Sequence, residues 1–427
     1  MGTTLLILLL VFLFLNLPVY VALLLSSVVS LLWFTYLSIG IAVQRMFSGI
    51  DKFTLMAIPF FIFAANIMNR GGLAPKIVRF AETVVGHIPG GLAFAVCLSC
   101  MFLGATSGSS PATLVAICSL MMAMMLGGGY SQGFTIGLIM AASSVAVIIP
   151  PSIGMIIYGA VTGTSVGELY SAGFIPGVVY GGVFMVYSYF YAKKYRIPVR
   201  KRATPGEICT AFKKAGWALG FPLVVLGSIY GGLCTPTEAA GIGCVYSLIV
   251  GVFIYKEMSL RDLENEAYKS AVGTAQVMII LAASSAFAWM MTRFQIPMKL
   301  AEAIISYGSS QLIVLMLMNI IMLIARMLID PASFQMILSP LFLPLARAVG
   351  VDPVHLGIIM VVNGAIGMFT PPFGLNLFMA TSVTKIPLGE LIKPRIVGPW
   401  VAVSLVALAL ITYIPWLTMV VPKLLFR

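Results

Sequence analysis

Long apolar stretches separated by short polar links follow one another along the whole chain. A helix needs roughly 20 apolar residues to cross the hydrocarbon core of a bilayer, and the stretches approach or reach that length. They lack the alternation of polar and apolar residues that a membrane β-barrel requires. Because backbone amides in lipid must be satisfied within the segment, the pattern predicts an all-α polytopic membrane protein. Clear examples are the stretches 3–14, 174–191, 272–291 and 397–412.

The sequence also contains an internal repeat, in which short motifs of the first half recur in the second half at a nearly constant offset. Four matches occur in the same order in both halves, which chance does not readily produce. They pair Gly104–Ala112 with Ile324–Ala332, Gly137–Met140 with Gly357–Met360, Pro150-Pro151 with Pro371-Pro372, and Gly167–Leu169 with Gly389–Leu391.

The repeat divides the chain into a first half at 1–192, a linker at 193–215 and a second half at 216–427. Each half is predicted to hold five transmembrane helices and a re-entrant helical hairpin, and an odd number of crossings makes the two halves inverted repeats. The hairpins are expected at 90–127 and 309–349, and a broken helix follows each one at 132–165 and 355–384. The other helices are expected at roughly 3–17, 19–44, 53–69 and 170–192, and at 216–233, 236–255, 270–292 and 395–422.

Charge sets the expected orientation. Only 9% of residues are charged, against roughly 25% in soluble domains. The net charge of +12 comes from Lys and Arg in the links between helices, and 17 of these 25 residues lie in four links that share one side of the membrane. The linker is the most basic of the four, so we expect it in the cytoplasm and the N-terminus outside. Topology therefore explains the positive charge, and no nucleic-acid partner is expected. The four links are 70–90, 193–214, 256–269 and 385–395.

Gly, Pro and Ser interrupt the apolar segments at corresponding places in both halves. Such paired interruptions are the best sequence indication of the binding site of a secondary transporter. Proline removes a backbone donor and frees carbonyl groups, and neighbouring hydroxyls complete a site suited to a hard cation such as Na⁺. Helix N-termini that begin after the breaks would face an anion. Small residues also allow close helix packing, but pairs of clusters repeated in both halves favour binding.

Asp330 is the acid expected near the middle of the membrane, where ionisable side chains are costly and usually functional. A helical i, i+4 spacing would place Arg326 beside it. Two interpretations stay open for Asp330, namely a cation-binding or gating role and a structural ion pair with Arg326.

The chain resembles the large membrane subunit of tripartite ATP-independent periplasmic (TRAP) transporters, as found in C4-dicarboxylate and sialic acid systems. The resemblance runs nearly end to end, and its most specific parts are the Thr-Pro-Thr-Glu-Ala-Ala run and the two Pro-Pro pairs. The motifs that carry it are Ala57–Phe61 with Met68–Gly72, Gly104–Thr113, Ile149–Ser152, Gly167–Tyr170 through Pro176-Gly177, Tyr230–Ala240 and Thr370–Gly374.

This resemblance implies the ion-transporter-superfamily elevator fold and a Na⁺ symporter in the bacterial inner membrane. The substrate class it implies is an organic acid such as a C4-dicarboxylate or sialic acid. It also implies two partners, a small membrane subunit of about four helices and a periplasmic substrate-binding protein. No organic cofactor is expected, and the two repeated sites suggest two or more Na⁺ ions.

The resemblance further implies which residues bind the ions and the substrate. The first Na⁺ site would comprise Ser107, Ser110, Ser144 and the carbonyls near Ile148 and Pro150. The second would lie near Asp330, Gly364, Gly367 and Thr370, and substrate near Thr106, Ser152, Pro371 and Asn376. The first tip is neutral and rich in Ser, whereas the second holds Asp330 and Arg326, so the two cation sites would differ in chemistry.

Three other classes of protein share parts of this pattern or of this function. A stand-alone Na⁺/anion symporter of the same superfamily would have the same hairpins but would need no binding protein. An intramembrane enzyme is not indicated, because acids other than Asp330 fall in links or near helix ends and no HExxH motif occurs. An ATP-driven pump would need a phosphate-binding Gly-x-x-x-x-Gly-Lys-Ser/Thr loop, which is missing. The sequence predicts a transporter and leaves the identity of its organic acid open.

Overall fold

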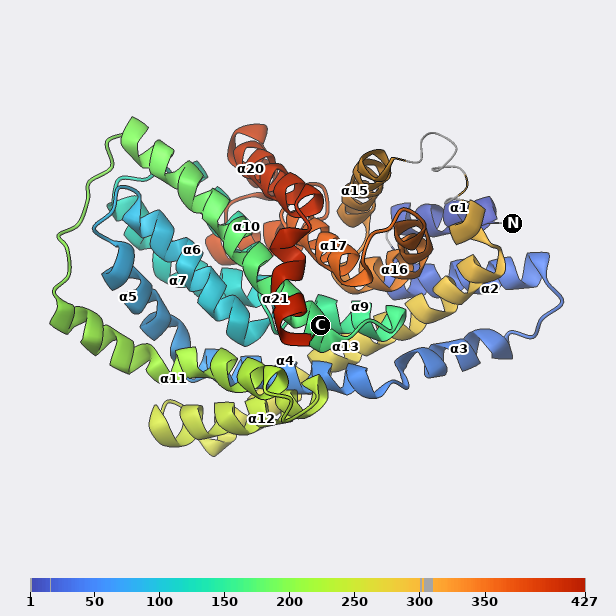
Figure 1. Cartoon of the computed structure of the whole chain (residues 1–427), viewed down its shortest axis with the longest axis horizontal. Coiled ribbons are helices and arrows are strands. Elements are labelled where there is room, and N and C mark those ends of the chain that lie inside the picture. The colour runs from blue at the N-terminus through green and yellow to red at the C-terminus, as the bar shows by residue number, and fades with distance from the viewer. Residues whose placement is uncertain (1, 16, 300–301, 303–309, 427) are drawn as a thin grey trace.

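The computed structural model describes residues 2–15, 17–299, 302 and 310–426, and Figure 1 shows their arrangement. Within these ranges the chain is almost entirely helical and contains no β-strand. Eight of the described helices are long and apolar enough to span a membrane. The prediction of an all-α polytopic membrane protein is therefore confirmed.

The helices of the first half are α1 (Gly2–Phe14), α2 (Val19–Phe34), α3 (Gly40–Ile50), α4 (Ala57–Arg70), α5 (Leu73–Val85), α6 (Gly91–Ser107), α7 (Ser110–Gly127), α8 (Gln132–Ser143), α9 (Ile153–Thr162) and α10 (Val166–Lys194). Those of the second half are α11 (Pro205–Tyr230), α12 (Pro236–Leu248), α13 (Leu260–Arg293), α15 (Gln311–Leu328), α16 (Pro331–Ala348), α17 (Pro353–Gly367), α18 (Leu375–Thr384), α19 (Leu388–Leu391), α20 (Pro394–Tyr413) and α21 (Trp416–Phe426). The predicted limits at 1, 309 and 427, and residue 16 of the predicted first helix, lie outside the described residues.

The ranges predicted for the hairpins and the broken helices each hold a pair of helices, and the pairs follow the repeat of the sequence. The first hairpin is the pair α6 and α7, and the second is the pair α15 and α16. The broken helices are the pair α8 and α9 in the first half and the pair α17 and α18 in the second. Each of these four helices in the first half precedes its counterpart in the second half by nearly the same number of residues that separates the repeated motifs. The repeat in the sequence is thus also a repeat of helices, whereas the inverted orientation of the halves and the re-entrant placement of the hairpins stay predictions.

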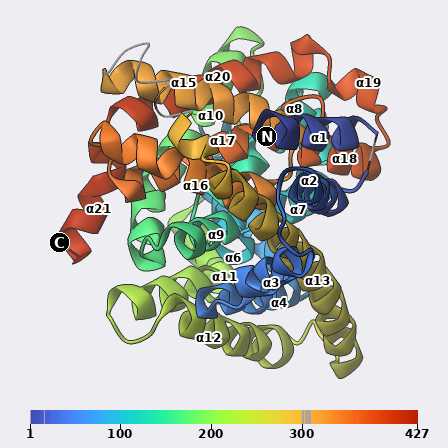
Figure 2. The same ribbon diagram turned by 90° about the vertical axis from the view of Figure 1, so that its right-hand side faces the viewer.

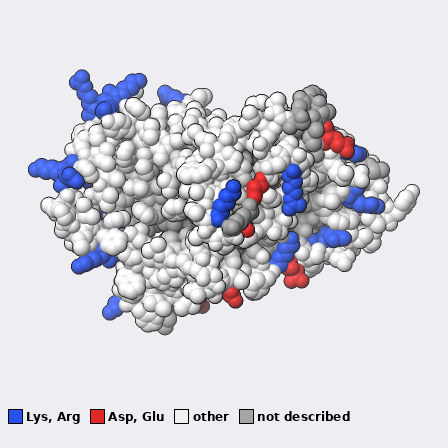
Figure 3. Space-filling view, viewed as in Figure 1, with Lys and Arg blue, Asp and Glu red and all other residues white. Residues whose placement is uncertain are grey.

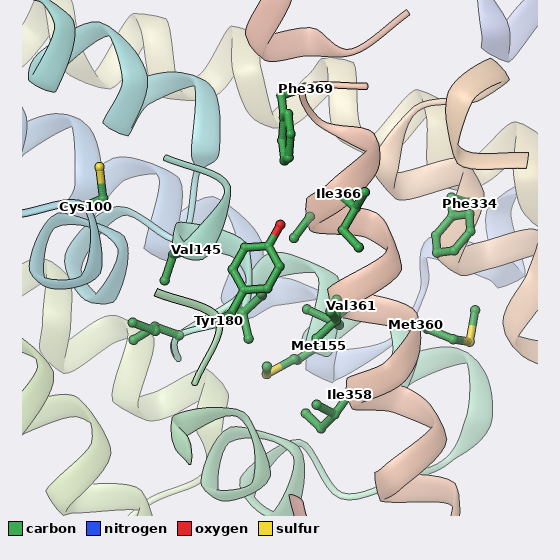
Figure 4. Packing of buried hydrophobic residues seen from close by; sticks show 14 of the residues in the cluster. Cys100, Val145, Met155, Tyr180, Phe334, Ile358, Met360, Val361, Ile366 and Phe369 are labelled. Carbon is green, nitrogen blue, oxygen red and sulfur yellow. The ribbon is translucent and has the colours of Figure 1, made fainter. Parts of the chain in front are cut away.

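The two halves pack into each other. Helix α4 of the first half contacts α12 and α13 of the second, and α10 contacts α20 and α21. Figures 1 and 2 show α13 running beside α2 and α3. Near the centre, the buried ring of Tyr180 lies between Val145 of the first half and Ile366 of the second (Figure 4). The hydrophobic core therefore continues through both halves.

Two of the predicted helices are each divided in the structure. The predicted helix at 19–44 is α2 and α3, because Thr35 takes an extended conformation and its hydroxyl bonds the Leu31 carbonyl at 2.6 Å. The predicted helix at 395–422 is α20 and α21, separated at Ile414 and Pro415. Proline at 415 removes a backbone donor, so a continuous helix is disfavoured there.

Helices also extend into the predicted polar links. Helix α5 occupies most of the link at 70–90, and α13 begins well before its predicted start at 270. Helix α11 begins at Pro205, where Thr204 and Glu207 form a capping box. The non-helical part of the predicted linker at 193–215 is therefore only 195–204. The Lys and Arg side chains of this region lie at the ends of α10 and α11, at the left of Figure 3.

Candidate functional site

A cavity of about 400 Å³ lies between the tips of the two hairpins. It is mainly apolar, with a few polar groups that converge from both halves, as is usual for small-molecule sites. Among the residues that line it are Gly108, Ser109, Ser110 and Pro111 of the first hairpin, Asp330, Pro331 and Gln335 of the second, Gly154 and Gly364 of the broken helices, and Gln276 of α13.

The first tip is a tight turn held by glycine. Gly108 ends α6 in the left-handed conformation with φ of +57°, and its N–H donates to the Gly104 carbonyl at 2.8 Å. A Cβ at Gly108 would lie 2.7 Å from the carbonyl oxygen of Pro151, so the tip touches the break between α8 and α9. The Ser107 hydroxyl lies 3.1 Å from that of Thr113, inside the same hairpin. This geometry brings the tip and the break of the first half together.

Ser110 connects the first tip to the second half. Its hydroxyl oxygen accepts a hydrogen bond from Asn376 Nδ2 at 2.8 Å, and the same amide group donates to the Met140 carbonyl at 2.8 Å. Ser110 and Asn376 are fully buried. The structure thus joins a residue predicted to bind Na⁺ to one predicted to bind substrate.

The break of the first half begins with the turn Ser144–Val147. The Ser144 hydroxyl donates to the Ala141 carbonyl at 2.6 Å and lies 3.2 Å from the Tyr180 hydroxyl, which in turn donates to Ser404 of α20. Ser144 therefore points toward α10 and α20. Its contacts differ from those of Ser107 and Ser110 at the tip.

The second tip is built around Arg326, which is 2% exposed. Its Nη1 donates to the Ile329 carbonyl at 2.6 Å, its Nε to the Gly364 carbonyl at 3.2 Å and its Nη2 to the Met368 sulfur at 3.0 Å. The guanidinium group consequently ties the second tip to the broken helix α17.

Asp330 caps α16 with one carboxylate oxygen. Oδ1 accepts from the Ala332 and Ser333 amides at 2.9 and 3.0 Å, while Oδ2 is buried and has no hydrogen-bond partner among the residues that the structure describes. Helix α15 ends at Leu328 and Ile329 is extended, so the expected helical i, i+4 relation between Arg326 and Asp330 is wrong. Their side chains form no ion pair within 4 Å among the described ones.

The other predicted residues do not line the cavity. The Thr106 hydroxyl bonds the Leu103 carbonyl, that of Ser152 bonds Val147, and that of Thr370 bonds Ile366, at 2.8, 2.6 and 2.6 Å. Two groups of predicted residues are absent from the cavity lining. They are Thr106, Ser152, Pro371 and Asn376 of the predicted substrate set, and Ser107, Ser144, Ile148, Pro150, Gly367 and Thr370 of the predicted Na⁺ sets.

Two cavity residues were missed in the sequence. Gln276 is a polar residue within the apolar stretch 272–291, and Gln335 is a polar residue in the second hairpin, five positions after Asp330. Polar side chains at membrane depth are usually functional, so both carried a usable signal.

A helical membrane fold with a cavity between the ends of repeated helix pairs is typical of a transport protein. Residues 6–417 match the family described as tripartite ATP-independent periplasmic transporter, DctM component. The C4-dicarboxylate TRAP transporter large permease protein DctM of Pseudomonas aeruginosa is 41% identical over 399 residues, which are 93% of each chain. The isethionate TRAP transporter permease protein DctMQ of Oleidesulfovibrio alaskensis is 38% identical over 410 residues, 96% of this chain and 64% of that protein. This chain therefore belongs to the DctM family and is a TRAP transporter large permease.

The fold itself also occurs among solved structures. The Alcanivorax borkumensis YdaH transporter superposes with a TM-score of 0.59 at 16% sequence identity and covers 89% of this chain and 88% of its own. At this identity the likeness concerns the fold alone.

Proposed function

We propose that this large permease imports an organic acid across the bacterial inner membrane by symport with Na⁺. The substrate class is a C4-dicarboxylate or a sialic acid, and the name of the relative from Pseudomonas aeruginosa supports the former. The single observation that carries the proposal is the cavity of about 400 Å³ between the two hairpin tips.

The two tips present different electrostatic environments to an anion. Helix α7 begins at the cavity without a side-chain cap on its N-terminus, so its amide groups and positive dipole end can face a carboxylate. The N-terminus of α16 is already capped by the Asp330 carboxylate. A carboxylate of the substrate therefore binds at the α7 end, beside Ser109 and Ser110.

The cation sites flank this cavity. In the first half we propose Ser107, Ser110 and Ser144 with the carbonyls near Ile148 and Pro150 as Na⁺ ligands. These groups are hydroxyl and carbonyl oxygens, the ligands that hard cations prefer. The corresponding groups of the second half lie around Asp330, Gly364, Gly367 and Thr370, where the Arg326 guanidinium group already donates to the Gly364 carbonyl.

We further propose an elevator mechanism. The two hairpins and broken helices (α6–α9 and α15–α18) move as one unit that carries the cavity from one side of the membrane to the other. The hydrogen bond between Ser110 and Asn376 supports this division, because it joins the first hairpin to α18 across the halves.

Two partners complete the transporter, a small membrane subunit and a periplasmic binding protein that delivers the substrate. The name DctMQ and the greater length of the Oleidesulfovibrio alaskensis relative are compatible with a small subunit carried on the same chain there.

Uptake into proteoliposomes tests the proposal. The complex with its small subunit is given radiolabelled succinate or sialic acid, with and without an inward Na⁺ gradient and the binding protein. We expect uptake only when both are present. Uptake that needs Na⁺ but no binding protein would make the chain a stand-alone symporter, and uptake that ignores the gradient would overturn Na⁺ coupling.

A further inference from the structure

Arg326 places a permanent positive charge where the second half is expected to bind a cation. Its guanidinium group contacts the Ile329 carbonyl at the tip and the Gly364 carbonyl in the broken helix, at 2.6 and 3.2 Å. Carbonyl oxygens of a tip and a break are the groups that Na⁺ would use. Here two guanidinium nitrogens already donate to them, Nη1 to the Ile329 carbonyl and Nε to the Gly364 carbonyl.

The internal repeat gives these contacts a counterpart in the first half. In the alignment that pairs Pro111 with Pro331, Ile329 and Gly364 correspond to Ser109 and Ser144. Position 326 corresponds to Thr106, whose hydroxyl bonds its own helix at Leu103. The first half therefore has equivalent backbone positions but no cation of its own, and the second half has one built in.

Helix α17 leaves space for the aliphatic part of the Arg326 side chain. A Cβ at Gly367 would lie 2.0 Å from Arg326 Cγ, so only glycine leaves room for the side chain at this position of α17. Arg326 is absent from the lining of the cavity between the tips and instead borders a separate, mostly apolar cavity of about 320 Å³ beside α1. The guanidinium group is thus directed at the protein and not at the substrate.

Asp330 balances this charge. Within the described part of the chain its Oδ2 is buried without a hydrogen-bond partner, and the negative charge of the carboxylate acts on Arg326 although the two side chains form no close ion pair. A dissolved Na⁺ beside the same carbonyls would be a second cation in a low-dielectric environment with one carboxylate to neutralise both. Electrostatic repulsion would oppose such binding.

We propose that the Arg326 guanidinium group takes the place of a Na⁺ ion in the second half. It binds the Ile329 and Gly364 carbonyls, so this half binds no Na⁺. The inference rests on the proposed Na⁺ coupling and specifies it, because the two repeated sites then hold one dissolved Na⁺ in place of two. The second site then holds a fixed positive charge, and no Na⁺ gradient is needed to fill that site.

Equilibrium binding of radioactive ²²Na⁺ to the purified complex with its small subunit tests this inference. At saturation, Arg326→Ala should bind one more Na⁺ per chain than the wild type, because the vacated carbonyls and Asp330 become available. Arg326→Lys keeps the charge and should bind the same number as the wild type. Equal numbers for a folded Arg326→Ala and the wild type, or an extra ion in Arg326→Lys, would overturn the proposal.

A second variant keeps the test decisive if Arg326→Ala does not fold. Asp330→Asn removes the carboxylate but keeps an oxygen that can cap α16, so the number of Na⁺ ions bound should not change. Loss of one ion would show that Na⁺ occupies the second site of the wild type and would refute the inference. Failure of the coupling proposal looks different, because wild-type uptake would then ignore the Na⁺ gradient while Arg326→Ala could still gain an ion.

Discussion

The side-chain amide of Asn376 donates to the hydroxyl of Ser110 at 2.8 Å, although the two residues are 266 positions apart. This hydrogen bond is fully buried and links the first residue of α7 to the second residue of α18. The same amide group donates to the Met140 carbonyl of α8. One side chain thereby joins the hairpin and the broken helix of the first half to the broken helix of the second.

Replacing Asn376 by Ala should destabilise the protein and reduce uptake. The change leaves the buried Ser110 hydroxyl without its partner, and an unsatisfied buried polar group costs about 1–3 kcal/mol. Ser110→Ala should destabilise the protein less, because Asn376 keeps its bond to Met140, but it should still reduce uptake, because it removes a proposed Na⁺ ligand. Thermal unfolding of the detergent-solubilised complex and proteoliposome uptake measure both effects. An Asn376→Ala protein as stable and active as the wild type would show that the link between the halves is dispensable.

Gly108→Ala should impair uptake more than its cost in stability alone explains. Alanine in the left-handed conformation costs roughly 1–2 kcal/mol, and the new Cβ would also lie 2.7 Å from the Pro151 carbonyl and displace the tip from the break. Gly163 is the matched control, because it has φ of +73° and nothing within 4 Å of a Cβ. Gly163→Ala should lose similar stability from backbone strain but keep uptake. Equal uptake in the two variants would contradict the proposed role of the contact between tip and break.

The sequence identified the elements that proline and glycine delimit. The hairpin predicted at 90–127 is α6 and α7, with their junction at Gly108 and Ser109, and the second junction lies at Ile329 and Asp330. Hydropathy predicted helices less well where a helix is amphipathic. Helix α5 buries Leu73 and Ile77 while Lys76 and Arg79 lie on less buried faces, so its sequence resembles a polar link.

Contacts between residues distant in sequence could not be predicted in the same way. Nothing local to Ser110 indicates Asn376, and the spacing of Arg326 and Asp330 is informative only if one helix contains both. Because α15 ends at Leu328, Arg326 reaches the Gly364 carbonyl of another helix. Side-chain partners of this kind depend on how the two halves pack together, which hydrophobic periodicity does not specify.

Gly367→Ala should lower thermal stability through its contact with Arg326. A methyl group at this position would overlap the arginine stem, and overpacking of a buried site typically costs about 1–3 kcal/mol. Gly364 provides the matched control on the same helix, because a Cβ there meets nothing within 4 Å. Gly364→Ala should therefore unfold at or slightly above the wild-type temperature, since alanine favours helix over glycine. Equal melting temperatures for both variants would mean that the packing of Arg326 against α17 adds little to stability.

Ser107→Ala should weaken the activation of uptake by Na⁺ while leaving the fold intact. If its hydroxyl is a Na⁺ ligand, losing a contact worth about 1 kcal/mol raises the Na⁺ concentration for half-maximal uptake by roughly fivefold. The fold should tolerate the change, because Thr113, whose hydroxyl lies 3.1 Å away, has a backbone carbonyl one turn earlier as an alternative acceptor. The Ser109 N–H, which donates to Ser107 Oγ at 3.3 Å, is partly exposed at the tip, so water can replace the lost acceptor. Ser119→Ala is the control on the same hairpin, since Ser119 is exposed and bonds the Ala116 carbonyl of its own helix at 2.9 Å. Uptake measured over a Na⁺ titration, with protein amount normalised by size-exclusion chromatography, separates the two variants. If Ser107→Ala titrates like Ser119→Ala, the Ser107 hydroxyl is no ligand and serves only to close the hairpin tip.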